Sequence, residues 1–338
     1  MIKKCLCGQT SEEIFNLISS SGFTHAHALS VSNSIYKRSA FEFEMIAGIP
    51  RSLRDKLSEI AFTGIFMPFA SEISADQSVK YLFRSDEGKK FETVYIPETK
   101  RHTVCVSTQS GCRMGCSFCI TGRYGFHGNL TPGEIINQII SLPFAHKITH
   151  VVFMGMGEPM DNLGNVLKAC EIITAEWGLA LSPRNVTVST VGIMPGISKF
   201  LELSDCNLTL SLHSPFKEER EKIAPVEKLY PVRGIIDKMK VHPLKRKRRL
   251  SIAYIMIKDF NDSESHLEAI KSILKDSVIR INLLPFNNTG NELYCSSSDE
   301  RMQYFKHSLI ISGISASIRK SRGVDISAAC GLLAKNLL

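Results

Sequence analysis

Six short runs of β-branched and apolar residues recur in the second two-thirds of the chain, with helical stretches between them. The runs are 104–108, 150–155, 185–190, 207–213, 250–256 and 279–286. The helices are expected at 131–141, 161–175, 196–203, 217–224 with 229–240, and 263–275. Because each run is almost continuously apolar, the pattern predicts an α/β fold with a parallel sheet and outer helices. Six units are too few for an eightfold barrel, so we expect a partial (βα)6 barrel.

The first 98 residues follow a different pattern. Residues 1–63 predict helices, the first opening at Ser11 and stopping before Gly22. Residues 64–98 alternate as strands do. We therefore expect a small helical and mixed accessory region at 1–98, and the barrel with a C-terminal loop at 99–338.

Composition narrows the class of protein. No apolar run approaches the roughly 18 residues that a membrane span needs, and the N-terminus lacks the apolar stretch of a signal peptide. We therefore expect a cytoplasmic protein without membrane contact. Ten cysteines in a reducing compartment favour metal binding or thiol chemistry over structural disulfides. The net charge of +8 suits a polyanionic partner.

Three cysteines are spaced C-x3-C-x2-C directly after the first predicted strand of the barrel. They are Cys112, Cys116 and Cys119. Three thiolates from one loop can hold three irons of a [4Fe–4S] cluster and leave the fourth iron open for a substrate. The alternative is a structural zinc site, with Cys105 or His102 as the fourth ligand.

Small polar residues and glycines follow several predicted strands. In a partial barrel these strand ends form the catalytic rim. Gly157 and Glu158 could offer a backbone edge and a carboxylate to a ligand's amino group. Ser189, Ser211, Leu212, His213 and Asn287 occupy matching places after other strands. Taken singly, each of these residues could instead be a turn former or a cap.

With these motifs the sequence resembles the RlmN/Cfr family of radical S-adenosylmethionine (SAM) RNA methyltransferases. The resemblance runs from about Glu92 to Leu333. It rests on ETVYIPE, CVSTQSGCRMGCSFC, FMGMGEP, SPRNVTVST, LSLHSP, INLLPFN and RGVDISAACG. The spacing of the three cysteines marks only the superfamily, whereas AACG together with GMGEP and SLHSP marks this family. The resemblance implies a radical SAM barrel.

The resemblance also implies roles for individual residues. Three cysteines would hold one [4Fe–4S] cluster per chain, and a second set would contact SAM. Those sets are Cys112, Cys116 and Cys119 for the cluster, and Gly157, Glu158, Ser189, Ser211, Leu212, His213 and Asn287 for SAM. Cys330 would be the cysteine that is methylated, Cys105 the second catalytic cysteine and Glu92 the proton acceptor. The other cysteines, Cys5, Cys7, Cys170, Cys206 and Cys295, match no family role.

The implied reaction is methylation of an adenine ring carbon through an S-methylcysteine at Cys330. The implied partners are ribosomal RNA, transfer RNA, and an electron donor such as a flavodoxin or ferredoxin. Ser327 replaces an acidic residue that the family usually has, and the segment 125–130 lacks a basic residue often found there. Some segments are closer to one branch of the family and some to the other, so carbon 2 and carbon 8 both remain open.

Two other functions compete with this one. A radical SAM enzyme acting on a protein or small molecule would keep the cluster but would not need the pair Cys105 and Cys330. A zinc-containing RNA-binding protein would use the cysteines for structure alone. Basic residues at 245–249 could contact RNA phosphates or form a solvated loop, since they precede a strand at the end opposite the rim. Arg319, Lys320 and Arg322 are better placed to guide RNA, and the N-terminal helices could recognise RNA shape.

Overall fold

The computed structural model describes residues 3–243, 248–289 and 294–337. Residues 245–247 of the basic segment at 245–249 lie outside these ranges. No helix among the described residues has both the length and the apolar character to cross a membrane.

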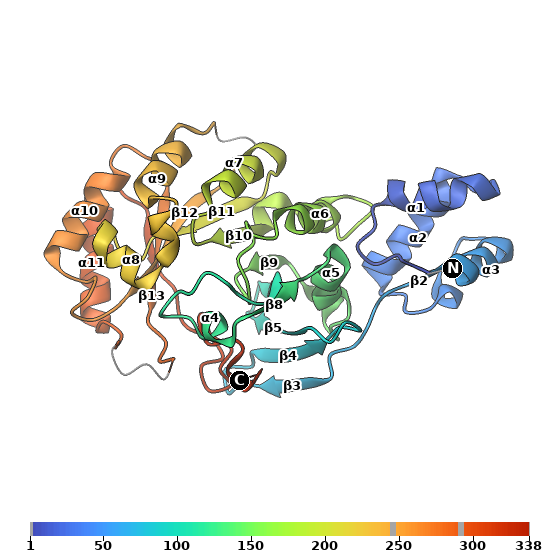
Figure 1. Ribbon diagram of the computed structural model, residues 1–338, viewed down its shortest axis with the longest axis horizontal. Helices are drawn as coiled ribbons and strands as arrows, with labels where there is room; N and C mark the ends of the chain where they lie inside the picture. The colour runs from blue at the N-terminus through green and yellow to red at the C-terminus, as the bar shows by residue number, and fades with distance from the viewer. Residues whose placement is uncertain (1–2, 244–247, 290–293, 338) are drawn as a thin grey trace.

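One mixed sheet runs through the centre of the described structure (Figure 1). Its strands lie in the order β14-β13-β12-β11-β10-β9-β6-β5-β4-β3. The strands from β6 to β14 in this order pair in parallel, whereas β3, β4, β5 and β6 pair antiparallel. The partial parallel barrel expected from the sequence is confirmed.

The six predicted parallel strands are all present. They are β6 (His102–Cys105), β9 (His150–Phe153), β10 (Val186–Thr190), β11 (Asn207–Ser211), β12 (Leu250–Met256) and β13 (Arg280–Pro285). Several observed strands stop short of the predicted carboxyl end. The residues left over, among them Gly155, His213 and Phe286, belong to the loops that form the rim of the barrel.

Helices cover the outside of these strands, as predicted. They are α5 (Pro132–Ile140), α6 (Leu163–Thr174), α7 (Met194–Leu203), α8 (Lys217–Ile223), α9 (Val232–Val241) and α10 (Glu264–Leu274). Side chains that alternate along the strands face them, for example Leu208 and Leu210 of β11, which are fully buried. This apolar layer between sheet and helices is the main core.

The inward faces of the same strands are polar. Thr209 of β11 and Ser251 of β12 hydrogen-bond to each other through their hydroxyls at 2.8 Å. Thr187 and Asn282 also line the interior. Small polar side chains fill less space than the branched apolar residues that close the interior of a full eightfold barrel. The interior therefore remains hollow.

Two elements after β13 were not predicted from the sequence. They are α11 (Asp299–Ile311) and β14 (Ala316–Ile318), which extends the parallel part of the sheet. A signal for the helix is present in the sequence. Ser298 caps it by accepting the Arg301 backbone N–H, and Met302, Phe305 and Leu309 follow at helical spacing and are buried.

Three antiparallel strands extend the sheet at its other edge. They are β3 (Ala70–Ile73), β4 (Val79–Arg84) and β5 (Lys90–Pro97), and β5 pairs with β6 of the barrel. Residues 65–69 show strand-like alternation but precede β3. Pro68 lacks the N–H that a ladder needs, and the Asn137 side chain takes both backbone groups of Phe66 at 2.8 and 3.0 Å.

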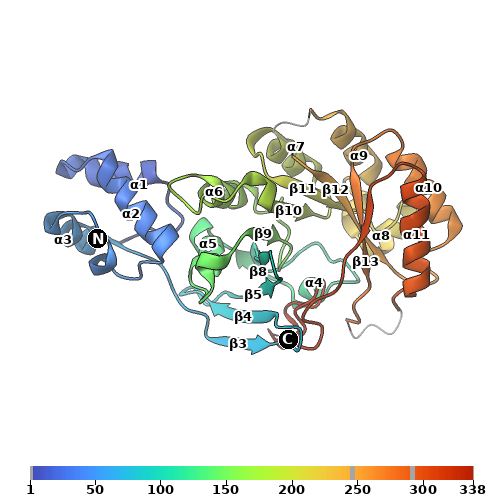
Figure 2. The same cartoon turned by 180° about the vertical axis from the view of Figure 1, so that it is seen from behind.

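The N-terminal helices form a lobe beside the barrel, visible at one side in both Figure 1 and Figure 2. They are α1 (Ser11–Ile18), α2 (His25–Arg38) and α3 (Arg51–Ile60), with the small pair β1 (Lys4–Cys5) and β2 (Ala61–Phe62). The predicted helical character of 1–63 is confirmed. A boundary of the accessory region at residue 98 remains a proposal, since β3–β5 belong to the barrel sheet.

Backbone contact between the N-terminal segment and α5 ties the lobe to the barrel. A Cβ on Gly133 would lie 2.5 Å from the carbonyl oxygen of Cys7, closer than such atoms approach in proteins. We expect Gly133→Ala to lower the free energy of unfolding by about 1–3 kcal/mol, the usual cost of overpacking. Urea denaturation would measure it.

Gly164 is the matched control, since it occupies the same second position of a helix, α6, with nothing within 4 Å of a Cβ. Gly164→Ala should be neutral or stabilise by up to about 1 kcal/mol through helix propensity. Equal denaturation midpoints for the two variants would contradict this account of the contact.

Candidate active site

A single cavity of about 980 Å³ runs through the hollow barrel, and most of the predicted site residues line it. They are Cys105, Cys112, Cys116, Cys119, Gly157, Glu158, Ser189, Ser211, His213, Asn287 and Cys330. Glu92 and Leu212 are not among the residues that line it. A cavity of this size accommodates a nucleoside-sized ligand.

The loop with the three cysteines follows β7 (Gln109–Gly111) and leads into α4 (Ile120–Tyr124). β7 pairs with β8 (Phe126–Asn129), and the N–H of Cys112 donates to the carbonyl of Gly125 at 2.8 Å. Gly111, with φ +79°, allows this approach, because a Cβ there would lie 1.7 Å from the Gly125 oxygen. The backbone thus fixes where the cysteine loop begins.

The three thiols influence one another across this loop. Burial raises the pKa of Cys112 to about 12, and the neighbouring Cys119 adds to the rise. Burial also raises the pKa of Cys116, followed by the effects of Cys119 and Cys112. Ionising several thiols that lie close together and away from water costs free energy, and a bound metal stabilises the thiolates. The chemistry of this donor set fits an iron–sulfur cluster.

No three His, Cys, Asp or Glu side chains in the described ranges surround a position for a single metal ion. In a [4Fe–4S] cluster each thiolate binds a different iron, so the cluster and a zinc ion need different spacings. His102, the suggested zinc ligand, lies at the amino end of β6, and its Nδ1 is 2.6 Å from the Tyr95 hydroxyl. The His102 ring is therefore hydrogen-bonded to Tyr95 at the amino end of β6, whereas the cysteine loop lies beyond the carboxyl end.

Glu158 is buried at the carboxyl end of the barrel. Its carboxylate accepts hydrogen bonds from Thr190 Oγ1 at 2.6 Å and from the N–H groups of Val191 and Met160 at 2.8 and 2.9 Å. Gln109 in turn accepts the Glu158 N–H at 2.9 Å. Burial raises the pKa of this carboxyl to about 7 despite these donors. A carboxylate has about four acceptor positions, so one remains for a ligand.

His213 contacts the cysteine loop from the end of β11. It has a left-handed backbone, with φ 58°. Its Nδ1 accepts the Ile255 N–H at 3.1 Å, and its ring packs edge-on against Phe118 at 4.7 Å. Burial lowers the pKa of His213 to about 3, so the ring is neutral near pH 7. With Nδ1 accepting, the ring proton lies on Nε2.

Asn287 contacts the C-terminal loop: its amide donates to the Cys330 carbonyl at 3.1 Å and accepts the Ser321 hydroxyl at 2.7 Å. Leu212 is fully buried. Its N–H donates to the Ala253 carbonyl, and its own carbonyl accepts from Arg220 at 2.9 Å. The predicted SAM contact of Leu212 stays a prediction.

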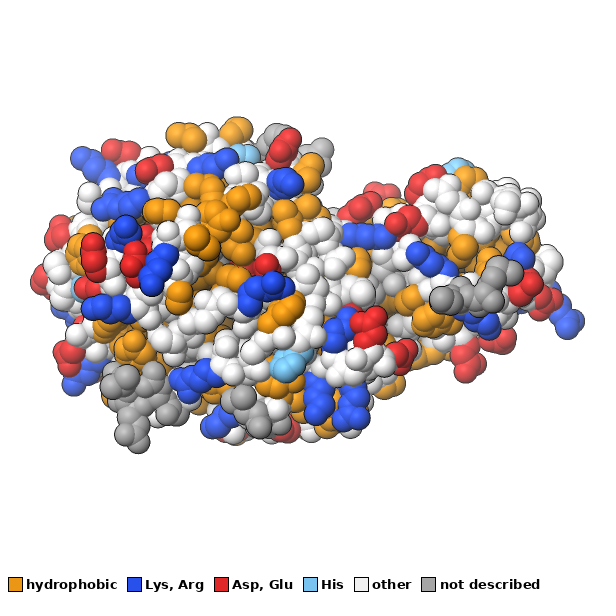
Figure 3. Space-filling model, viewed as in Figure 1, with side chains coloured by type: hydrophobic (Ala, Val, Ile, Leu, Met, Phe, Trp, Pro, Cys, Tyr) orange, Lys and Arg blue, Asp and Glu red, His pale blue; other side chains and the backbone are white. Residues whose placement is uncertain are grey.

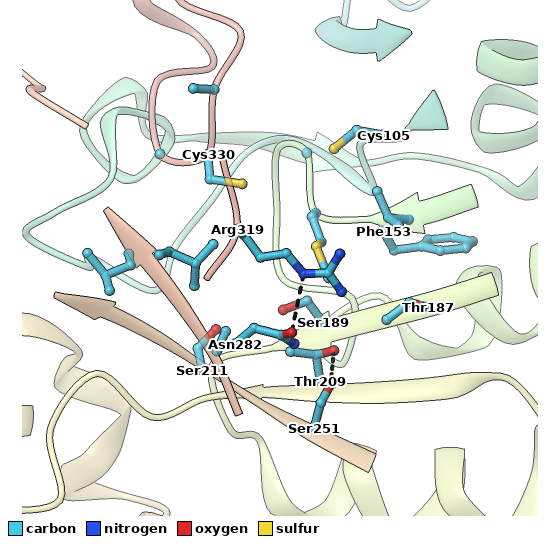
Figure 4. A pocket seen from close by; sticks show the side chains of 18 of the residues that line it. Cys105, Phe153, Thr187, Ser189, Thr209, Ser211, Ser251, Asn282, Arg319 and Cys330 are labelled. Atoms are coloured by element: carbon cyan, nitrogen blue, oxygen red, sulfur yellow. Dashed lines mark hydrogen bonds between the residues drawn. The ribbon is translucent and has the colours of Figure 1, made fainter. Parts of the chain in front are cut away.

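Cys105 and Cys330 face one cavity from two distant parts of the chain. Figure 4 shows their sulfurs directed toward one another, from β6 and from the C-terminal loop. Burial and then the nearby Cys330 raise the pKa of Cys105. The Cys330 side chain is open to the cavity, but the surrounding walls still raise its pKa by desolvation, with Cys119 as a further cause. Both residues are therefore thiols at rest.

Glu92 lies beneath the C-terminal loop and is fully buried. One carboxylate oxygen accepts the Ala334 N–H at 2.9 Å. The other lies 3.8 Å from Lys80 Nζ and has no hydrogen-bond partner within the described structure. Desolvation raises the pKa of this carboxyl. A buried carboxyl with an unused oxygen has the character of a proton acceptor.

Lys80 was not singled out from the sequence, and it positions the C-terminal loop. Its buried ammonium donates to the Ile326 carbonyl at 2.7 Å and pairs with Glu72 at 3.2 Å. Asp325 adds two contacts to the same hairpin, accepting from Ser74 Oγ at 2.6 Å and from the Ala75 N–H at 2.9 Å. The hairpin β3–β4 thus anchors the segment that carries Cys330.

Arg220 was also not singled out, and it joins the strand ends. Its fully buried guanidinium pairs with Glu227 and donates to the backbone carbonyls of Val191, Ser211 and Leu212. In the sequence it is one charge among several in a polar helix. Only its burial in the fold reveals the role.

The basic segments are less available to RNA than their sequence indicates. Arg248 is buried and donates to the carbonyls of Cys206 and Leu201. Arg322 lies 4.0 and 3.7 Å from carboxylate oxygens of Asp76 and Glu98. In Figure 3, Lys and Arg side chains are interspersed with Asp and Glu over the visible face.

Comparison with known proteins identifies the class of this site. Residues 106–270 match the radical SAM superfamily. A Parabacteroides distasonis protein named as a probable dual-specificity RNA methyltransferase RlmN is 42% identical, over 99% of this chain and 98% of its own. The RlmN of Syntrophotalea carbinolica is 37% identical, over 96% and 88%.

A solved structure agrees with the fold over the full length. A radical SAM methyltransferase from Sphaerobacter thermophilus superimposes with a TM-score of 0.91 at 33% identity, covering 98% of this chain and 99% of its own. The likeness therefore includes the lobe, the barrel and the C-terminal loop together.

The anchoring by Lys80 can be tested directly. Lys80→Met keeps the length of the side chain but leaves the Ile326 carbonyl without its donor, a loss of about 1–3 kcal/mol for a buried group. We expect faster proteolysis within 319–331 and faster alkylation of Cys330. The exposed variant Lys56→Met, whose ion pair with Glu59 is on the surface, serves as control. Unchanged cleavage and alkylation in Lys80→Met would show that the loop holds without this contact.

Proposed function

The chain belongs to the RlmN family of radical SAM RNA methyltransferases, and we propose that it methylates carbon 2 of an adenine in ribosomal RNA and in transfer RNA. Family membership makes it a SAM-dependent RNA methyltransferase. Family membership does not give the ring carbon or the kinds of RNA, and these are what we propose. Related proteins are named dual-specificity enzymes, which supports two classes of RNA substrate.

The observation that carries the proposal is the meeting of five cysteines in one cavity. Cys112, Cys116 and Cys119 supply the thiolates for a cluster, and Cys105 and Cys330 face the same space. A radical SAM enzyme acting on a protein or small molecule has no need of this second pair. Its presence supports methyl transfer through a cysteine.

We propose that each chain holds one [4Fe–4S] cluster through these three thiolates and that a flavodoxin or ferredoxin supplies its electron. When bound, the cluster reductively cleaves SAM and supplies a 5′-deoxyadenosyl radical. Gly157, Glu158, Ser189, Ser211, Leu212, His213 and Asn287 are proposed to hold SAM. Glu158 keeps its fourth acceptor position for the SAM amino group, and neutral His213 can donate through Nε2 without adding charge beside the sulfonium.

Cys330 then carries the methyl group. An adenine ring carbon of this kind is not nucleophilic, so direct transfer from the sulfonium fails. Cys330 first accepts a methyl group from one SAM, loses a hydrogen atom from that methyl group to the adenosyl radical, and bonds to the ring through the resulting carbon. Cys330 lines the cavity and is itself exposed, so a nucleic acid can reach it.

Cys105 and Glu92 complete the reaction in this proposal. Glu92 takes the ring proton through its unused oxygen. The unpaired electron left on the ring would return to the cluster. Cys105 then attacks the sulfur of Cys330, the carbon released from that sulfur takes up a proton to become the methyl group, and a Cys105–Cys330 disulfide remains. Once Cys330 carries an alkyl group it cannot ionise, so one of the two causes that raise the pKa of Cys105 disappears. A disulfide that must be reduced in every cycle supports a cytoplasmic location.

RNA contact is proposed for the N-terminal region up to residue 98, with its helical lobe beside the barrel. Mass spectrometry of nucleosides from ribosomal and transfer RNA, in cells with and without the gene, tests the function. Loss of 2-methyladenosine from both RNA classes supports it. Loss of 8-methyladenosine would move the site of reaction to carbon 8, and unchanged nucleosides would contradict RNA methylation by this chain.

The cluster ligands give a direct prediction. Cys112→Ala, Cys116→Ala and Cys119→Ala should each abolish cluster assembly and SAM cleavage, because each thiolate holds a separate iron. Cys295→Ala is the matched control, since Cys295 is exposed and has no proposed role. Anaerobic iron analysis should find about four irons per chain in the control. A ligand variant that kept full iron and still produced 5′-deoxyadenosine would be inconsistent with the assignment.

The order of steps gives a second prediction. Cys105→Ala should still be methylated at Cys330 and should bond to the RNA, but it lacks the thiol that resolves the adduct. A protein–RNA adduct should therefore accumulate and be visible on denaturing gels as a nuclease-sensitive band. Cys330→Ala and the double variant should give no adduct, because no sulfur accepts the methyl group. A cluster-loaded Cys105→Ala protein without an adduct would argue against this mechanism.

A further inference from the structure

The cavity has a second end that the methylation chemistry does not use. It extends from the cysteine loop to the amino ends of the strands, where arginines line it. Arg101 directly precedes β6, Arg249 directly precedes β12, and Arg280 opens β13. We refer to this part of the cavity, together with Arg319, as the arginine end.

Strand geometry aims these arginines inward. Successive residues of a strand point to opposite faces, and Arg101, Thr103 and Cys105 are alternate residues that all line the cavity. Arg249 and Ser251 follow the same rule on β12. Along β6 and along β12, the side chains that face the cavity therefore begin with a guanidinium, continue with a small polar side chain and end near the rim.

Arg319 reaches the same space from the segment after β14. Figure 4 shows its guanidinium projecting into the cavity beside Asn282, and its Nε donates to Asn282 Oδ1 at 3.2 Å. A guanidinium has five N–H donors. Asn282 takes one of these donors, which leaves the others for a ligand.

These arginines form no ion pair with a carboxylate in the described part of the chain. Among the residues that the structure describes, no carboxylate oxygen lies within 4.0 Å of the guanidinium of Arg101, Arg249, Arg280 or Arg319. Glu98 also lines the cavity and raises the pKa of Arg101, but its ion pair is with Arg322 at 3.7 Å. The arginine end thus has a clear excess of positive charge.

The charges also repel one another. Desolvation lowers the pKa of Arg101, Arg319 and Arg249 lower it further, and Glu98 partly opposes them. The pKa of His150, at the start of β9, is lowered by burial and then by Arg101 and Arg249, while Glu98 acts in the opposite direction. A bound anion lowers the repulsion between like charges that lie together in a partly enclosed cavity. The surrounding hydroxyl and amide groups can complete its hydrogen bonds.

The arginine end is distant from the cluster loop. β11 runs from Asn207 at this end to Ser211 at the rim, four steps of about 3.3 Å, or roughly 13 Å. We propose that Arg101, Arg249 and Arg319 bind a phosphate-bearing anion inside the barrel, at a site separate from the methylation centre. Guanidinium groups match phosphate oxygens in geometry and charge. The proposal does not depend on the methylation mechanism.

Calorimetric titration of inorganic phosphate into the cluster-loaded full chain tests the site, at constant ionic strength set with chloride. We expect saturable binding of one phosphate per chain. The double variant Arg101→Gln/Arg249→Gln should weaken it at least about tenfold, because it removes two charge-assisted partners. Arg249→Gln/Arg319→Gln, at two exposed positions, gives the same test without touching the half-buried Arg101.

The matched control is Arg233→Gln/Lys238→Gln on the exposed face of α9, which removes the same charge far from the cavity end. Phosphate affinity should be unchanged in the control, and iron content should be unchanged in all three proteins. No saturable binding, or equal weakening in the control and the arginine variants, would overturn the proposal.

A competition arm distinguishes the source of the phosphate. A short single-stranded RNA oligonucleotide with a 5′-phosphate is added before the phosphate titration. If it displaces phosphate from the wild-type site, the site binds a phosphate of RNA. If phosphate binding is unchanged, the ligand is a small phosphorylated molecule or phosphate itself. Either result is consistent with the proposed anion site.

Discussion

Parallel pairing of the strands from β6 to β14 determines where every functional side chain can be. All these strands begin at one edge and end at the other. The loops that follow them are therefore neighbours in space although they are far apart in sequence. Glu158 and Thr190 meet in this way across 32 positions, joined by a 2.6 Å hydrogen bond. Arg220 reinforces the arrangement by bonding to carbonyls of two strand ends.

A partial barrel leaves one side open, and the chain closes that side with its C-terminal segment. The antiparallel hairpin β3–β4 makes this possible, because it extends the sheet beyond β6 and anchors the segment through Lys80 and Asp325. The segment brings Cys330 opposite Cys105. Two thiols separated by 225 positions can then act as a pair. The accessory strands are thus part of the catalytic arrangement.

The polar interior has consequences beyond the rim. Branched apolar side chains would fill the barrel and leave only a surface pocket. Threonine, serine and asparagine instead leave about 980 Å³ open from end to end. One end is lined by thiols and a buried carboxyl, the other by guanidinium groups. A barrel of this kind can hold two ligands of different chemistry, separated by the length of a strand.

The sequence by itself determined the six parallel strands, the helices between them and the cysteine loop, because these depend on local periodicity and spacing. It also indicated Glu158 and His213 through their places after strands. Only the tertiary structure decided that Lys80 and Arg220 hold the site together, because a buried charge looks like a surface charge until its neighbours are known. The same holds for the inward direction of Arg101 and Arg249, which follows from how the strands curve around a common interior. No local pattern links Cys105 with Cys330: the resemblance to a known family implied the pair, and the fold brings both side chains to one cavity.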